Sequence, residues 1–271
     1  MTPLYPTPLY PTLFMAALWA EALKAYRSKV IWLSAAVATI LPLVDGMFMV
    51  ILKNPERAKE MGLIGAKAQL VAGTATWPNF FYVMMMTGIA VGILFAFLTA
   101  WVFGREFSDR TAKELLALPT PRGTIVAAKF VLLAVWTQAL ALWIFGLSLV
   151  IGRAVDIPGG SSNLQVVSFG YFMSIAFMNY LLMPCVAYVA SLGRGYLPPM
   201  AWIFITLASA QLLQVMGWGE WYPWAVPALV GEMAGPKGGS LGAHSLLMVL
   251  AAFVAGLAAT FAWWRNADQT R

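Results

Sequence analysis

Residues 80–103 read FFYVMMMTGIAVGILFAFLTAWVF, a run of 24 residues without a charged side chain. A helix needs about 20 apolar residues to cross the hydrocarbon core of a bilayer. A helix that is apolar on every side is either buried in a large core or spans a membrane. The whole chain has 271 residues, of which 61% are apolar and 10% charged, far from the composition of a soluble domain. The sequence therefore predicts an integral membrane protein.

Five further apolar runs on either side of this stretch are long enough to span a bilayer. They are residues 30–52, 130–151, 166–190, 197–216 and 246–264. The run 15–29 is different, because Glu21, Lys24, Arg27 and Lys29 alternate with apolar side chains, which is typical of a helix lying along the membrane interface. We expect an all-α membrane protein with six transmembrane helices and an N-terminal interfacial helix.

The first 14 residues carry the unit TPLYP twice, and repeated prolines disfavour a helix. We interpret residues 1–14 as a disordered Pro-rich tail and residues 15–271 as one six-span domain. Translation from Met15 instead of Met1 is an alternative that the sequence leaves open.

The distribution of basic residues predicts the orientation. If the N-terminus is inside, eleven of the 17 Lys and Arg residues lie in the inner segments and six in the outer ones. Basic residues favour the cytoplasmic side of a membrane. We therefore expect a multi-pass protein of the plasma membrane with both termini in the cytoplasm. The basic excess indicates membrane orientation and not nucleic-acid binding.

The segment that follows the charge-free run is rich in charge, with six charged residues between Arg105 and Glu114. Charges are costly inside a bilayer, so this segment must leave it. Opposite charges four residues apart, such as Glu106 and Arg110, predict a helix with pairs along its side, and Pro119 would end it. From the residues alone, this cytoplasmic helix is either a docking element or a solvated cap of the preceding span.

The pattern of Glu106, Thr111, the run 115–119, Arg122 and Lys129 resembles the connection between the second and third spans of ABC-2-type transporter permeases, especially the bacitracin-type exporter branch. The match is incomplete, since that family commonly has Gly-Thr where this chain has Arg110-Thr111. The aromatic and Pro-rich residues 217–234 are similar to the short helical hairpin before the last span of those permeases.

The resemblance implies the membrane-spanning permease subunit of an ATP-driven ABC exporter. It also implies a separate ABC ATPase subunit, in two copies, and a second permease chain in a homo- or heterodimer. The cytoplasmic segment would then be a coupling helix whose polar face docks on the ATPase and whose apolar stripe packs toward the membrane. The residues assigned to it are Glu106, Phe107, Asp109, Arg110, Lys113, Glu114, Leu115 and Leu118.

Four other residues are candidates for the transport pathway or an outer gate: Asp45, Trp221, Tyr222 and Trp224. Asp45 lies near the end of the first span, where snorkelling to the interface is the simpler interpretation. The aromatic residues equally suit an interfacial belt. Small residues such as Gly256 could serve either subunit pairing or packing within one chain.

The sequence also restricts the chemistry. It contains no G-x-x-x-x-G-K-[ST] motif, so we expect no enzyme activity and no cofactor in this chain, with ATP and Mg²⁺ on the partner ATPase. One His and one Cys exclude most clustered metal sites. A rhomboid-type protease would need Ser148 and His244, but Leu149 stands where its motif has glycine. A secondary transporter or channel remains the other alternative.

Overall fold

The computed structural model describes residues 10–54, 74–109, 111, 120–233 and 241–266, and these residues form helices and turns without a strand. The helices are α1 (Tyr10–Tyr26), α2 (Lys29–Lys53), α5 (Trp77–Met86), α6 (Gly88–Ser108), α8 (Arg122–Ala154), α9 (Ser162–Leu192), α10 (Leu197–Val215), the 3₁₀ turn η1 (Gly219–Trp221), α11 (Val226–Met233) and α12 (Ala243–Asn266).

In the part of the chain that the structure describes, six helical spans are long and apolar enough to cross a membrane: α2, α5 together with α6, α8, α9, α10 and α12. The prediction of an all-α membrane protein with six spans is confirmed. The first helix, α1, begins at Tyr10, inside the segment expected to be a tail. Pro11 lies in its first turn, where a missing N–H removes no helical hydrogen bond.

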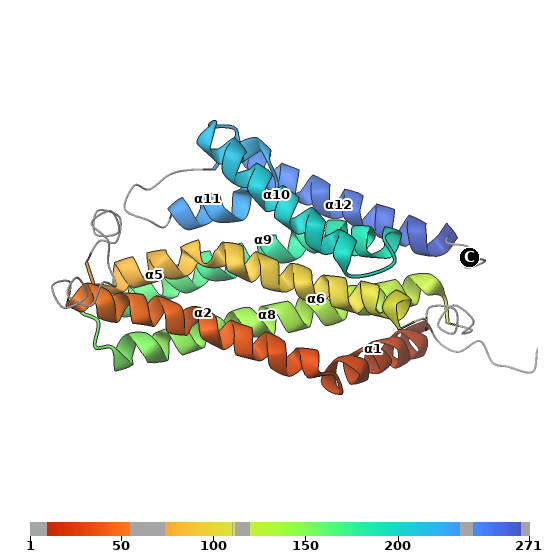
Figure 1. Cartoon of the computed structure of the whole chain (residues 1–271), viewed down its shortest axis with the longest axis horizontal. Coiled ribbons are helices and arrows are strands. Elements are labelled where there is room, and N and C mark those ends of the chain that lie inside the picture. The colour runs from red at the N-terminus through yellow and green to blue at the C-terminus, as the bar shows by residue number, and fades with distance from the viewer. Residues whose placement is uncertain (1–9, 55–73, 110, 112–119, 234–240, 267–271) are drawn as a thin grey trace, which may run out of the picture.

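The spans run side by side in three rows (Figure 1). Helices α2 and α8 form one side of the bundle, α6 and α9 lie in the middle, and α10 and α12 form the other side. Helix α9 packs against α6, α8, α10, α11 and α12, so it is the central element. The second half of α9, which includes Leu182 and Val186, is mostly buried, as expected of a helix with neighbours on several sides.

Close packing around α9 depends on small residues of its neighbours. A Cβ added at Gly256 of α12 would lie 2.6 Å from the backbone nitrogen of Cys185, and one at Gly92 of α6 would lie 2.6 Å from Asn179 Oδ1. Both contacts are shorter than a carbon atom tolerates, so the helices approach closely only because no side chain intervenes. These glycines therefore pack helices within one chain.

The two ends of the bundle differ in composition. At one end, which we call the α1 end, α1 packs beside α8, and the last turns of α6 and α12 lie at the same end of the bundle (Figure 1). At the opposite end, the far end, the Trp77 ring fills the space beside Gly152 and Gly160. Lys53 Nζ donates there to the carbonyl of Val155 at 2.7 Å. Among the described residues, three of the four buried charged side chains, those of Glu21, Glu106 and Lys129, gather at the α1 end, and the fourth, Asp45, lies in the second half of α2.

Candidate functional site

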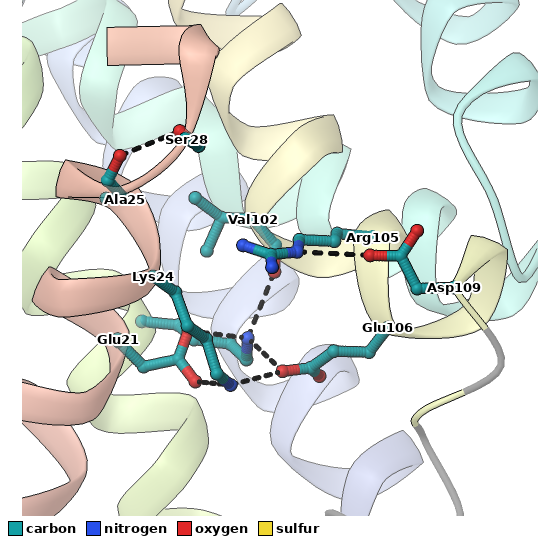
Figure 2. A network of polar contacts seen from close by, with 9 residues as sticks. Glu21, Lys24, Ala25, Ser28, Val102, Arg105, Glu106 and Asp109 are labelled. Atoms are coloured by element: carbon teal, nitrogen blue, oxygen red, sulfur yellow. Dashed lines mark hydrogen bonds and ion pairs between the residues drawn. The ribbon is translucent and has the colours of Figure 1, made fainter.

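Four charged side chains from three helices meet at the α1 end: Glu21 and Lys24 of α1, Glu106 of α6 and Lys129 of α8. Lys129 Nζ lies 3.0 Å from Glu21 Oε2 and 2.9 Å from Glu106 Oε1. Lys24 Nζ lies 2.7 Å from Glu21 Oε1 and 3.2 Å from Glu106 Oε1. Figure 2 shows the closed ring of contacts that results, which we call the ion cluster.

Helical spacing places the side chains of the ion cluster on the faces where α1, α6 and α8 meet. Glu21 and Lys24 are three residues apart on α1, so they lie on the same face. Val102 and Glu106 are four residues apart on α6, and Lys129 Nζ donates both to the Val102 carbonyl, at 3.0 Å, and to Glu106. The Lys129 ammonium thus uses three acceptors, which is its full capacity.

The ion cluster is almost free of solvent contact. Lys129 is 0% exposed, Glu106 4% and Glu21 5%, and only Lys24 reaches the surface. Burial alone would raise the pKa of Glu21, but the ammonium groups of Lys129 and Lys24 outweigh that effect and hold this pKa below its ordinary value. Glu21 is therefore ionised, and the four residues of the ion cluster have two formal charges of each sign.

The position of the ion cluster relates it to the connection between α6 and α8. Glu106 lies two residues before the last residue of α6, and Lys129 lies in the second turn of α8. The chain between these helices therefore leaves and re-enters the bundle next to the ion cluster. As a consequence, the last turn of α6 and the first turns of α8 are fixed to each other and to α1.

Aromatic contacts also fix the last turn of α6. The Phe107 ring packs against Trp263 and Trp264 of α12, with ring centroids 5.6 and 5.9 Å apart. Trp264 is buried, and its Nε1–H donates to Ser191 Oγ at 3.0 Å. The last turn of α6 is thus held between the ion cluster on one side and the end of α12 on the other.

The structure corrects the role expected for Glu106. We assigned its carboxylate to the exposed docking face, but it is buried and paired with Lys129 and Lys24. Asp109, in contrast, is exposed and pairs with Arg105 at 3.2 Å. The other residues assigned to the coupling helix lie outside the described residues: Arg110, Lys113, Glu114, Leu115 and Leu118.

Asp45 also differs from expectation. Its side chain is 4% exposed and accepts a hydrogen bond from Thr87 Oγ1 at 2.9 Å. The snorkelling interpretation is therefore wrong, because the carboxylate points at the junction between α5 and α6. Its second oxygen, Oδ2, has no hydrogen-bond partner in the part of the chain that the structure describes.

The aromatic residues before the last span form two groups at the far end. Trp221 stacks on His244 with ring centroids 4.4 Å apart, and His244 Nε2 lies 3.3 Å from Glu220. Tyr222 and Trp224 contact each other at 5.7 Å between centroids. The short helix α11 follows and packs against α5 and α9.

The residues needed for a serine protease are not assembled. Ser148 is buried, and its hydroxyl donates to the Ile144 carbonyl within α8. His244 contacts Glu220 and Trp221. Among the described residues, no group of three His, Cys, Asp or Glu side chains could hold a metal ion.

Sequence reasoning missed the ion cluster. Glu21 and Lys24 were interpreted as the polar side of an interfacial helix, and the third span was expected to begin at residue 130. Helix α8 in fact begins at Arg122, so Lys129 lies inside a helix classed as a span. A lysine directly before an uninterrupted apolar run was the available signal, since such a charge requires a partner.

Comparisons with known proteins agree with this architecture. A family model described as ABC-2 family transporter protein matches residues 17–209. The chain is also 28% identical over 190 residues to the bacitracin transport permease protein BCRB of Bacillus licheniformis, a match that covers 69% of this chain and 88% of that protein. The region matched by the family model contains every residue of the ion cluster.

Proposed function

Since the chain belongs to the ABC-2 family of transporter proteins, as a permease of the bacitracin-type branch, we propose that it is the membrane-spanning subunit of an ATP-driven exporter and couples to a separate ATPase subunit. Two copies of the ATPase and a second permease chain would complete the assembly. ATP and Mg²⁺ would bind to the ATPase.

The observation that carries this proposal is the ion cluster, which lies where α6 ends and α8 begins. A partner that pushes on this connection moves the last turn of α6 and the first turns of α8 together, because Lys129 bonds to Glu106 and to the Val102 carbonyl. Glu21 passes the same displacement to α1 through its 3.0 Å contact with Lys129. Coupling would thus reach three helices from a single docking point.

The proposed orientation places the α1 end in the cytoplasm, where the ATPase binds its nucleotide. It is supported by the excess of basic residues in the segments assigned to this side. Single cysteines at Lys113 and Lys59, in a Cys185→Ala background, test it with an impermeant maleimide on intact cells. We expect labelling at position 59 and protection at position 113, and the reverse result would contradict both the orientation and the coupling.

The docking surface is tested by a charge reversal at its exposed edge. Asp109 is exposed beside the connection, and Asp156 is exposed at the far end, so Asp109→Lys and Asp156→Lys form a matched pair. A like charge placed in an interface costs several kcal/mol, whereas an exposed ion pair contributes about 0–1 kcal/mol. We expect Asp109→Lys, but not Asp156→Lys, to lose ATPase co-purification and ATP-dependent transport.

Two results would contradict the proposal. If Asp109→Lys retains as much ATPase as Asp156→Lys, the connection is only a cap of the second span. If the purified permease catalyses uptake or efflux in vesicles without ATPase, the chain is a secondary transporter or channel.

A further inference from the structure

An open groove of about 580 Å³ lies between α1, α2 and α8, next to the ion cluster. Its size is within the range of about 300–1,000 Å³ that is usual for small-molecule sites. Apolar side chains form its walls: Leu23 of α1, Ile31 of α2, and Leu132 and Val135 of α8. None of the described residues that line it carries a charge, so these walls suit an apolar occupant.

The α1 wall is built by helical spacing. Trp19, Leu23 and Tyr26 are four and three residues apart, so they share one face of the helix. Ala22 and Ala25, which directly follow Glu21 and Lys24, also line the groove. Trp19 is 71% and Tyr26 73% exposed, although both are large aromatic residues. Such amphipathic rings are typical of the boundary between lipid tails and headgroups.

The groove lies at the depth of lipid tails. Leu132 and Ala139 line it and lie ten and seventeen residues after Arg122, the first residue of α8. At 1.5 Å per residue they are about 15 and about 26 Å along the helix. The α8 helix is a span, so this part of the groove opens toward hydrocarbon in the leaflet of the α1 end.

Two positive charges stand at the mouth of the groove. Arg27 lies in the turn between α1 and α2, directly after Tyr26, and Lys29 is the first residue of α2, two residues before Ile31; Tyr26 and Ile31 both line the groove. Both basic side chains are exposed, and the described residues supply no ion-pair partner for either. Positive charge at a membrane surface attracts anionic lipid headgroups.

We infer that this groove binds one acyl chain of an anionic phospholipid, whose headgroup contacts Arg27 and Lys29. The charged mouth and the apolar walls match the two parts of such a molecule. The bound acyl chain fills the space between α1 and α8 and so supports the contact of Glu21 with Lys129. This lipid site does not depend on the proposed binding of an ATPase to the protein.

The headgroup is tested by native mass spectrometry of the purified full-length protein with palmitoyl-oleoyl phosphatidylglycerol and phosphatidylcholine, which have the same acyl chains. We expect the wild type to retain one phosphatidylglycerol with a preference of at least about tenfold, which two basic residues near a surface can supply. Arg27→Gln with Lys29→Gln should abolish the preference. Arg194→Gln with Arg265→Gln, two other exposed arginines at the α1 end, is the matched control and should keep it.

The apolar part is tested by filling the groove. Ala139→Trp adds a large ring in the groove, whereas Ala255→Trp adds it at an exposed position on α12. We expect Ala139→Trp to lose both lipids and Ala255→Trp to retain them, with equal helix content by circular dichroism. Equal retention by the two variants, or no headgroup preference in the wild type, would overturn the inference. So would disulfide-linked dimers of Ala139→Cys in a Cys185→Ala background, because a second chain would then cover the groove.

Discussion

Lys129 is the residue whose removal tests the ion cluster most directly. Lys129→Met keeps the length of the side chain but leaves Glu21 and Glu106 buried, with only the half-exposed Lys24 as a counterion. Removing one partner from a buried charge network costs about 3–5 kcal/mol. For a chain of this size, each kcal/mol lowers Tm by about 2–4 °C. We therefore expect Tm to fall by about 6–20 °C in thermal unfolding of the purified protein.

Two further variants make this result specific. Lys24→Met removes the same charge from the exposed edge of the ion cluster, where a pair contributes about 0–1 kcal/mol, so Tm should change by at most about 4 °C. The combination Glu21→Gln, Glu106→Gln and Lys129→Met removes the stranded charges and should recover most of the lost Tm. If Lys129→Met melts within about 2 °C of the wild type, the cluster does not hold the helices as we argue.

Three other predictions concern pH, packing and the buried acid. The pKa of Glu21 is lowered in the folded protein, so the stability that its carboxylate contributes is present above the ordinary pKa of 4.5 and is lost as the pH falls below 4.5. Tm should therefore decline below pH 4.5, and it should decline less in Glu21→Gln. Gly256→Ala forces a Cβ to 2.6 Å from the Cys185 backbone nitrogen and should destabilise the protein by about 1–3 kcal/mol. Gly146→Ala, whose Cβ has no neighbour within 4 Å, should be neutral or stabilising. Equal Tm values for the two variants would contradict this prediction. Asp45→Asn keeps an oxygen to accept from Thr87 and should fold with a Tm near that of wild type, while Asp45→Ala should melt lower.

The six spans were predictable because each depends on local composition alone. A run such as residues 80–103 is long enough to span the membrane and has no charge, and its neighbours along the chain follow the same rule. The ends of the spans were less accurate. Helix α8 starts at Arg122, because pairing inside the protein allows Lys129 to be buried where an isolated lysine could not be.

The partners of charged residues were the part that the sequence could not provide. Glu106 was expected to pair with Arg110 along its own helix, which is the natural choice when only local spacing is known. In the structure, Glu106 contacts Lys129, 23 residues away, and Lys24, 82 residues away. Contacts between distant segments depend on how the helices pack, and this packing is not encoded in periodicity. Asp45 was misassigned for the same reason, since Thr87 lies 42 residues away.

The sequence separation within the ion cluster has a consequence for biosynthesis. Glu21 emerges from the ribosome together with Lys24 but 108 residues before Lys129, so two spans are made before its second counterion exists. Glu106 and Lys129 are only 23 residues apart and can neutralise each other as a hairpin when the third span enters the bilayer. The order of synthesis therefore predicts that α6 and α8 pair first and that α1 is the last of the three to take its place. A membrane insertase would handle this region as a neutral pair of helices instead of two separate charged segments.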